Sequence, residues 1–497
     1  MGVQKFARIC PVCEPRRGLV IEADPDSGAV GRVSGDPDHP SSKGYVCPKS
    51  QAIKASRDDA DRLRKPLIRD GDGFREANWE EALDYAAAGL KQVLARRGPQ
   101  ASGLYLGNPS AHVAALQMVV GSLLGVMPAM MTGAAAIDHF ARNMVGAFLY
   151  GNIGNVPVPD VERTDFFLIF GANPLVSHGS MFGAPGMPDR LKRLKARGSR
   201  LVVVDPRRTP TAEAADDHFA IRAGTDALLV LAMIDTLFRE GLMRAGRMEG
   251  HVSGPDELQA IAARFSPVHV SPLTGIAPDR IVQLARDFAA ARTAAAYSRV
   301  GVNTQSFGTV GVWAVDCLNI LTDNCDAEGG VIFPEGRLPV FTHDPYEGDR
   351  PPHGRWRSRV SGAPELGGTM PTHAMWEDIE TTGQGQIRGL VTIAGNPVLS
   401  NPNAGRMPDA IGTPDGKMAL AAAPFLADIP RPEQAIADGA FAPDRLRLTL
   451  ANSLQGANDN RLSDDTAFDV PSGCASFNGT PIVVERVRPV DANRNAA

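Results

Sequence analysis

Three cysteines near the start of the chain have a spacing that suits metal chemistry. Cys10 and Cys13 form a C-x-x-C pair, and Cys47 follows in the phrase Gly-Tyr-Val-Cys-Pro-Lys. Thiolates in this spacing can chelate one metal ion or bind one iron–sulfur cluster. The sequence therefore predicts a single metal site with Cys10, Cys13 and Cys47 among its ligands.

A loop that recurs along the chain suggests ligand binding. In each copy an apolar strand is followed by glycine and then by Asn-Pro: Gly107-Asn108-Pro109, Gly171-Ala172-Asn173-Pro174 and Gly395-Asn396-Pro397. Ligands of open α/β sheets bind at the carboxyl ends of the strands, where backbone N–H groups and helix N-termini gather. Glycine lets a phosphate approach the backbone. Asn-Pro is also a common turn, so one copy would favour a plain turn, whereas three copies at strand ends favour binding.

Alternating strands and helices are predicted to position these residues. Apolar runs predict buried strands at 102–106, 166–170, 201–204 and 390–393. Asn78 is a good N-cap for a helix that runs to Arg97, and further helices are expected at 111–124, 138–149, 189–197, 225–240, 279–291 and 312–321. Two short strands at 19–22 and 30–33 precede them. This alternation predicts an α/β fold with parallel sheets.

The remaining segments are less regular. Residues 342–385 are rich in Pro, Gly and charge, which predicts a long surface excursion. Of the last fifty residues, only 446–450 are predicted to form an element.

Composition excludes several classes of function. A chain of 497 residues with 43% hydrophobic content can form several domains, and its net charge of -5 provides no basic surface for nucleic acid. No run of 18 uncharged apolar residues predicts a membrane span. Six cysteines in this length suit a reducing compartment, and the N-terminus carries no export signal. A cytoplasmic enzyme is expected.

Several sequence segments together resemble one protein family. They are the cysteine region with Ser34–Pro40, Asp165–Pro174, Val202–Thr209, Ala223–Asp226, the stretch from Asn319 to Gly330, and Gly395–Ser400. In this order, from about residue 6 to 411, the chain resembles the molybdopterin oxidoreductases, which include formate dehydrogenases and dimethyl sulfoxide reductases.

The resemblance implies a molybdenum or tungsten bis(pterin guanine dinucleotide) cofactor. It also implies a small N-terminal iron–sulfur module at 1–60 and two related Rossmann-like α/β halves. A dinucleotide-binding region at 61–340 would be followed by the excursion and a second binding loop at 341–411. The residues expected to contact the cofactor are Gly107, Asn108, Gly171, Asn173, Pro174, Asp205, Arg207, Gly224, Asp226, Gly395, Asn396 and Pro397. An Asp at a strand end can accept from a ribose hydroxyl or a guanine N–H, and Arg207 can pair with a phosphate. The alternative for Asp205 is a helix cap.

The resemblance also implies catalytic residues. Asp138 lies where family members carry the protein ligand to the metal, and His139 beside it could move a proton. Alternatively, Asp138 caps the following helix and His139 packs. Lys49 matches a lysine that lies between cluster and pterin in several members; a solvated surface lysine is the other interpretation.

The chain departs from the family in two places. Arg17 occupies the position of the cluster motif's third cysteine, so an iron–sulfur cluster would lack one ligand. His39 could complete a zinc-like set instead, although it belongs to the family's ordinary loop sequence. After Met407 the sequence departs from the family's order. Residues 412–417 resemble a segment that lies much later in the sequences of family members. Residues 412–497 are therefore expected to be a remnant, with the C-terminal barrel domain largely missing.

Two functions from different classes follow. The first is an oxidoreductase, similar to formate dehydrogenase, that moves electrons or an oxygen atom between a small substrate and an acceptor, with an electron-transfer partner protein. The second is a degenerate scaffold, poor in cofactor, or an electron-transfer subunit without turnover. A nicotinamide-dependent dehydrogenase is disfavoured because no G-x-G-x-x-G motif follows a strand with an acidic residue at the right distance.

Overall fold

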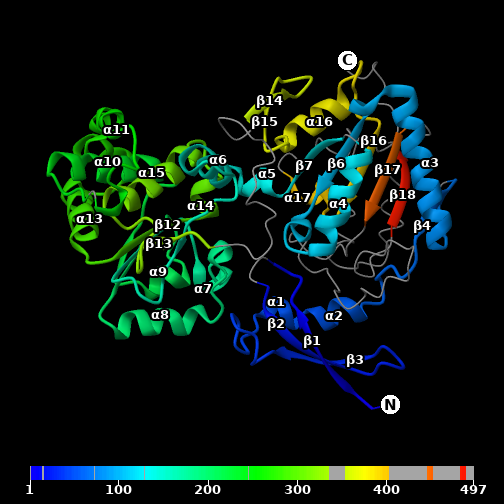
Figure 1. The fold of residues 1–497 in the computed structure, drawn as a ribbon, viewed down its shortest axis with the longest axis horizontal. Coiled ribbons are helices and arrows are strands. Elements are labelled where there is room, and N and C mark those ends of the chain that lie inside the picture. The colour runs from blue at the N-terminus through cyan, green and yellow to red at the C-terminus, as the bar shows by residue number, and fades with distance from the viewer. Residues whose placement is uncertain are drawn as a thin grey trace. The chain divides into compact units, whose positions relative to one another are not determined.

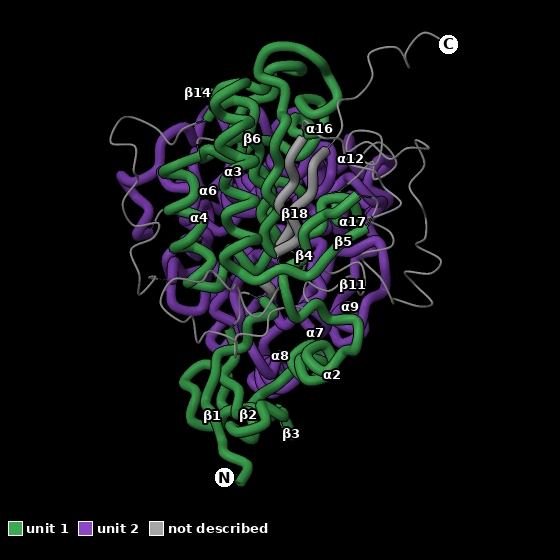
Figure 2. The backbone as a smooth tube through the Cα atoms, turned by 90° about the vertical axis from the view of Figure 1, so that its right-hand side faces the viewer, with its two compact units in different colours: residues 1–137, 352–497 green, residues 138–351 purple. Residues whose placement is uncertain are grey.

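The computed structural model describes residues 2–13, 16–71, 73–127, 129–244, 246–334, 353–401, 445–450 and 482–487. The chain divides into two compact units (Figure 2): unit 1 is Met1–Ile137 with Pro352–Ala497, and unit 2 is Asp138–Pro351. The boundary at Asp138 falls within the range 61–340 that the sequence suggests as one region. The reason is that strands that precede unit 2 in the sequence and strands that follow it form one sheet in unit 1.

The N-terminal module of unit 1 is a three-stranded antiparallel sheet with two short helices (Figure 1). Its strands are β1 (Gln4–Ile9), β2 (Gly18–Ala23) and β3 (Val30–Gly35), in the order β1-β2-β3. Helices α1 (Pro48–Gln51) and α2 (Ile53–Asp58) follow. The strands expected at 19–22 and 30–33 are therefore confirmed. β1 is not evident from the sequence because almost all of it is exposed, so no apolar face marks it.

A mixed seven-stranded sheet forms the larger part of unit 1, in the order β5-β4-β18-β17-β16-β6-β7. Its strands are β4 (Leu67–Asp70), β5 (Gly73–Glu76), β6 (Ser102–Leu106), β7 (Met130–Gly133), β16 (Gly389–Ile393), β17 (Arg445–Leu450) and β18 (Ile482–Val487). β6 pairs in parallel with both β7 and β16, and β16 pairs in parallel with β17. The strands expected at 102–106, 390–393 and 446–450 are confirmed, whereas β18 was not predicted. The rest of 412–497 lies outside the described residues.

Helices of unit 1 begin where the sequence supplies caps or apolar faces. In α3 (Trp79–Arg97), the Asn78 side chain accepts a hydrogen bond from the Glu81 N–H at 2.9 Å, so the predicted N-cap is confirmed. Next come η1 (Pro99–Ala101), η2 (Asn108–Ala111) and α4 (Ala114–Val126); α17 (Pro397–Ser400) follows β16. A short helix, α5 (Ala135–Asp138), ends at the unit boundary.

Part of the segment expected to be a surface excursion is in fact buried. The hairpin of β14 (His353–Arg357) and β15 (Pro364–Leu366) leads into α16 (Thr372–Glu380). In α16, Met375, Trp376 and Ile379 pack in one cluster with Tyr105 and Leu390 of the sheet. The prediction of a surface excursion is therefore wrong for 372–380. The polar composition of the surrounding sequence conceals apolar residues at helical spacing, which are buried in α16. Residues 335–352 lie outside the described part.

Unit 2 is built on a four-stranded parallel sheet in the order β11-β10-β9-β12. The strands are β9 (Phe166–Phe170), β10 (Arg200–Val204), β11 (Asp217–Phe219) and β12 (Ala294–Ser298). β8 (Val158–Pro159) and β13 (Val331–Ile332) form a separate pair. The continuous apolar runs predicted at 166–170 and 201–204 are confirmed as buried parallel strands.

Helices cover both faces of this sheet. Successive side chains of β9 point to opposite faces and pack in different hydrophobic clusters. Leu168 packs in the cluster that includes α10 and α13, while Phe167 packs in the cluster that includes α8. The helices of unit 2 are α6 (Phe140–Tyr150), α7 (Pro174–Ser177), α8 (Met187–Ala196), α9 (Pro210–Ala214), α10 (Asp226–Arg239), α11 (Pro255–Ala262), α12 (Pro267–Thr274), α13 (Pro278–Ala290), α14 (Val300–Asn303) and α15 (Gly308–Leu321). The mixed α/β class predicted for the chain is thus confirmed.

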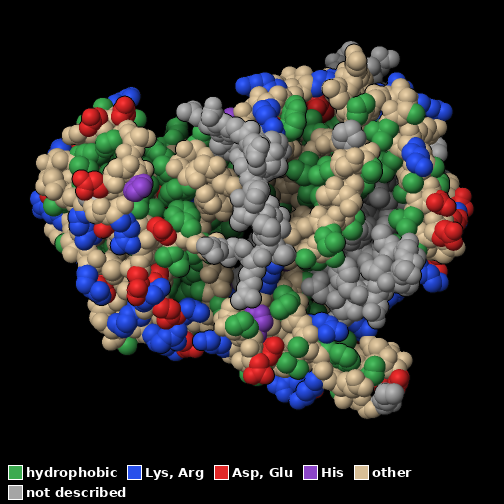
Figure 3. All heavy atoms as spheres, viewed as in Figure 1, with side chains coloured by type: hydrophobic (Ala, Val, Ile, Leu, Met, Phe, Trp, Pro, Cys, Tyr) green, Lys and Arg blue, Asp and Glu red, His purple; other side chains and the backbone are tan. Residues whose placement is uncertain are grey.

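The molecular surface matches the charge balance of the sequence. On the face that Figure 3 shows, basic and acidic side chains are interspersed over unit 2, with no uniformly basic area. Among the residues that the structure describes, no helix has both the length and the apolar character needed to cross a bilayer.

Candidate functional site

In unit 1, two of the recurrent glycine loops lie against each other at the carboxyl ends of β6 and β16. The Gly107 N–H donates to the Ile393 carbonyl at 2.8 Å. A Cβ on Gly107 would come within 1.7 Å of the Ala394 carbonyl oxygen, and one on Gly395 would lie 2.8 Å from the Gly107 Cα. Only glycine fits this contact. The prediction that these loops follow strands is confirmed, and the loops at Gly107 and Gly395 form one edge.

The asparagines of these loops do different things. The Asn396 side chain accepts from the Val398 N–H at 3.0 Å and the Leu399 N–H at 3.4 Å, so it caps α17. In unit 2, the Asn173 amide oxygen instead accepts from the Thr211 hydroxyl at 2.7 Å. The turn interpretation therefore holds for the side chain of Asn396.

Unit 2 repeats the glycine contact at the ends of β9 and β12. The Gly301 N–H donates to the Gly171 carbonyl at 2.9 Å. A Cβ on Gly171 would lie 2.8 Å from the Gly301 carbonyl carbon, and Gly171 has a φ of +53°. Each unit thus has two adjacent parallel strands that end in glycines packed on each other.

Asp205 follows β10 at this edge, and it does not cap a helix. Its Oδ1 accepts from the Arg207 N–H at 2.8 Å. The N-cap of α9 is Thr209, whose hydroxyl accepts from the Ala212 N–H at 3.2 Å. The alternative interpretation of Asp205 is therefore wrong. The carboxylate is half-buried and the Arg207 side chain is exposed.

Asp226 is the buried acid of the same edge. It begins α10 just after Gly224, which has a φ of +86°, and is only 1% exposed. Its Oδ2 accepts from the Gln305 amide at 2.9 Å, while Oδ1 has no donor among the residues that the structure describes. Burial raises the pKa of Asp226, the Gln305 bond lowers it, and the negative charge of Asp205 raises it further. A buried acceptor without a donor is costly, so this position suits a ligand that carries N–H or O–H groups.

Asp138 and His139 precede α6, and Arg299 lies beside them. α6 begins after His139, so Asp138 is not its N-cap, and that alternative is wrong. The Asp138 carbonyl accepts from the Asn303 amide at 3.0 Å. Arg299 Nη1 donates to His139 Nδ1 at 3.1 Å. Burial, followed by the charges of Arg299 and Arg142, lowers the pKa of His139 to about 3. The imidazole is therefore neutral, with its proton assigned to Nε2 by these contacts.

A buried ion pair fixes α6, the helix that His139 precedes. Arg142 donates to both carboxylate oxygens of Asp316 on α15, at 2.9 and 2.5 Å. Arg142 is 6% exposed and Asp316 is 3% exposed. Arg142, Arg299 and Gln305 are residues of this region that sequence reasoning missed. The only signal for Arg299 is that it directly follows the strand β12.

The three cysteines predicted as metal ligands lie around one buried arginine. Arg17 Nη1 is 3.4 Å from Cys47 Sγ and 3.8 Å from Cys13 Sγ, and the Ser50 hydroxyl contacts the sulfurs of Cys10 and Cys47 at 3.4 and 3.5 Å. Burial raises the pKa of Cys10. Burial also opposes ionisation of Cys47, but hydrogen bonds from Ser50 and the charge of Arg17 leave the pKa of that thiol below its usual value.

The His39 ring bonds within its own loop, and Lys49 contacts Cys47 through its backbone N–H. His39 Nδ1 accepts from the Ser42 N–H at 3.2 Å and contacts the Ser42 hydroxyl at 3.0 Å, within its own loop. Lys49 is exposed on α1, so its assignment stays a prediction. Among the described residues, no group of three or more His, Cys, Asp and Glu side chains is placed to hold a metal ion.

A buried hydrogen bond connects the cysteine module to the loop that follows β6. His112, which ends η2 after the Gly107 loop, is 5% exposed, and its Nε2 donates to the Pro11 carbonyl at 2.6 Å. This bond ties the loop between Cys10 and Cys13 to the loop after β6. Sequence reasoning gave no sign of it.

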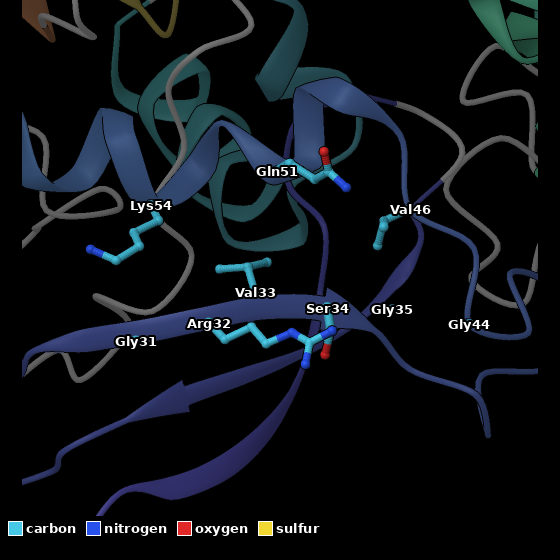
Figure 4. Close-up of a pocket in the computed structure, with 9 residues that line it drawn as sticks. All are labelled: Gly31, Arg32, Val33, Ser34, Gly35, Gly44, Val46, Gln51 and Lys54. Atoms are coloured by element: carbon cyan, nitrogen blue, oxygen red, sulfur yellow. The ribbon is translucent and has the colours of Figure 1, made fainter.

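A groove also opens in the N-terminal module, between β3 and the α1–α2 segment (Figure 4). Its volume is about 660 Å³, and its wall includes Arg32, Val33, Gln51 and Lys54. None of the residues predicted to bind cofactor or metal lines it. We therefore place the candidate site at the glycine edges and not in this groove.

Comparisons with known proteins identify the family of the chain. The model of the family "Molybdopterin oxidoreductase" matches residues 62–418, so the chain belongs to that family. The F420-dependent formate dehydrogenase subunit alpha of Methanocaldococcus jannaschii is 27% identical over 92% of this chain and 68% of its own length. A nitrate reductase of Symbiobacterium thermophilum is 26% identical over 81% of this chain and 56% of its own length. Acetylene hydratase from Pelobacter acetylenicus shares the fold, with a TM-score of 0.65 over 82% of this chain and 59% of that one, at 19% identity.

The comparisons establish the class of enzyme. Relatives named as formate dehydrogenase and nitrate reductase, together with the family match, make this chain an oxidoreductase whose family implies a molybdenum or tungsten pterin cofactor. The chain spans 68% and 56% of the lengths of these two relatives.

Proposed function

We propose that the chain binds a bis(pterin guanine dinucleotide) of molybdenum or tungsten and oxidises or reduces a small oxyanion of the formate class. The observation that carries the proposal is the acidic edge of unit 2. There, the Oδ1 of Asp226 is buried with no donor among the described residues, next to the carboxylate of Asp205. Guanine and ribose both present N–H or O–H donors, which suit two carboxylates at a strand edge.

The glycine edges supply the other requirement of a dinucleotide. In unit 2 the loop at Gly171 and in unit 1 the loop at Gly395 each pack against a second glycine at the end of a parallel strand, where a side chain would clash. On this proposal a phosphate of each dinucleotide would lie beside these loops, because ligands of open α/β sheets bind at the carboxyl ends of parallel strands. Each unit thus has one edge of the kind that a dinucleotide needs. On this proposal, Gly107, Asn108, Asn173, Pro174, Arg207, Gly224, Asn396 and Pro397 complete the contacts.

Asp138, His139 and Arg299 would form the reacting end of the site. When bound, the metal supplies the two-electron or oxygen-atom chemistry of the cofactor. Asp138 offers a hard oxygen ligand to it. Arg299 has five N–H donors in a planar fork, which suits a planar oxyanion, and His139 receives one of them. The neutral imidazole keeps its Nε2–H for a hydrogen bond to substrate. An anionic substrate also fits the names of the formate and nitrate relatives.

The degenerate scaffold is the second candidate. Arg17 at a cluster position favours it, because one expected ligand is lost. The orphaned acceptor of Asp226 favours the enzyme, since a chain without cofactor gains nothing from a buried acceptor that lacks a donor.

Asp205→Ala tests the cofactor site. The change removes an acceptor of the dinucleotide, and a donor left unpaired costs about 1–3 kcal/mol, or roughly 5- to 150-fold in affinity. We expect the purified variant to lose pterin and activity together. Asp189→Ala is the matched control, because that side chain is 73% exposed on α8 of the same unit. Equal pterin contents in Asp205→Ala and the parent would remove Asp205 from the site.

A further inference from the structure

The resemblance to the family implies that the N-terminal module would hold an iron–sulfur cluster. In this chain Arg17 lies in the middle of that module. Its side chain is 1% exposed and is the largest fully buried side chain of the described structure. Nη1 points at the sulfurs of Cys47 and Cys13, at 3.4 and 3.8 Å. The guanidinium carbon lies 5.5 Å from the centre of the Tyr45 ring. The positive group is therefore buried beside two of the three thiols and does not lie on the surface.

Burying a guanidinium is expensive unless anions or acceptors surround it. Nε and Nη2 of Arg17 have no hydrogen-bond partner among the described residues, which do not include Glu14 and Pro15. The groups found within reach of the guanidinium are sulfur atoms and an aromatic face. Thiol sulfur is a weak acceptor of N–H groups, and a π-face attracts a cation.

The three cysteines do not fit a cubane cluster in this arrangement. Such a cluster needs an outer ligand on each iron and an open space between the ligands. Here one ligand is absent, and Nη1 of the arginine that replaces it lies 3.8 and 3.4 Å from the sulfurs of Cys13 and Cys47. The Ser50 hydroxyl bonds to two of the three sulfurs, those of Cys10 and Cys47. The described residues also lack any group of three Cys, His, Asp or Glu placed for a metal ion.

We propose that Arg17 replaces the iron–sulfur cluster, so that a guanidinium–thiol cluster of Arg17, Cys13, Cys47 and Tyr45 forms the centre of a metal-free module. This proposal does not depend on the pterin site. It also means that Lys49 has no cluster from which to assist electron transfer. The module keeps its contact to the sheet of unit 1 through the bond from His112 to the Pro11 carbonyl.

The experiment compares the iron content of the full-length parent with that of Arg17→Cys. Both are produced with cofactor and cluster biosynthesis, purified without oxygen, and incubated with ferrous iron, sulfide and a thiol reductant. We expect no iron above background in the parent and about four irons per chain in Arg17→Cys, with the visible absorption of a cluster. The double variant Arg17→Cys/Cys47→Ser is the matched control, and it should lose that iron again.

Native mass spectrometry of the parent keeps the test decisive if Arg17→Cys fails to fold. A parent whose mass includes no iron or sulfide, before and after incubation, supports the proposal. A parent that carries a stable three-iron or four-iron cluster overturns it. Pterin content is read from the same samples. Iron in a parent that also binds pterin refutes only this inference, whereas absence of both iron and pterin refutes only the proposed function.

Discussion

Asp138→Ala is expected to abolish turnover while bound pterin stays at the level of the parent. Asp138 is half-buried, directly precedes the His139–Arg299 pair, and does not cap α6. On the proposed function it supplies the protein's oxygen ligand to the metal, whereas residues at other strand ends hold the dinucleotides. Alanine is the best helix former, so the end of α5 should tolerate the change.

The measurement is dye-linked activity and pterin content on the same preparation. Asp138→Ser is the matched variant, because it keeps an oxygen donor at the position, and it should retain part of the activity. A loss of pterin in Asp138→Ala would mean that the residue holds the cofactor and not only its metal. Full activity in Asp138→Ala would remove the residue from the metal.

Arg142→Met should lower the free energy of unfolding of unit 2 by about 3–5 kcal/mol, since it leaves the buried Asp316 carboxylate without a partner. Methionine keeps much of the length of the arginine stem, so the loss reports on the charge and not mainly on a cavity. The double variant Arg142→Met/Asp316→Leu should recover most of the stability, because it removes both charges. Denaturant midpoints measure both.

An exposed pair provides the comparison for this prediction. Arg75 and Glu81 are 45% and 42% exposed, and Arg75→Met should leave the midpoint almost unchanged. If Arg142→Met were as harmless as Arg75→Met, the ion pair between α6 and α15 would not fix the helix that follows His139.

The elements that the sequence predicts well are those whose local pattern agrees with their packing. β9 and β10 are continuous apolar runs because both of their faces are buried, and α3 begins at an asparagine that caps it. β1 and α16 escape prediction for opposite reasons. β1 is a strand with almost no buried face, and α16 is buried although its surroundings are rich in Pro, Gly and charge. β1 is held by pairing with the next strand, β2, and α16 by packing against Tyr105 and Leu390, so in both the contacts outweigh local composition.

Some residues of the candidate site can also be predicted from the sequence, and others cannot. Asp205 and the glycine loops can be found from the sequence because each directly follows a recognisable strand. Arg299 and Gln305 cannot, because they reach His139 and Asp226 only through the pairing of β12 with β9, which no local pattern predicts. For Arg17 the sequence shows a missing ligand, but not that the replacement side chain turns inward among the thiols.

The metal and pterin content of the parent chain tests the account most directly. The full chain is expressed in cells that make the pterin cofactor, purified without oxygen, and analysed for molybdenum, tungsten and released pterin. We expect pterin together with one of the two metals in a fixed ratio to protein. A chain that is folded and yet carries neither pterin nor metal would contradict it and would identify the protein as a scaffold.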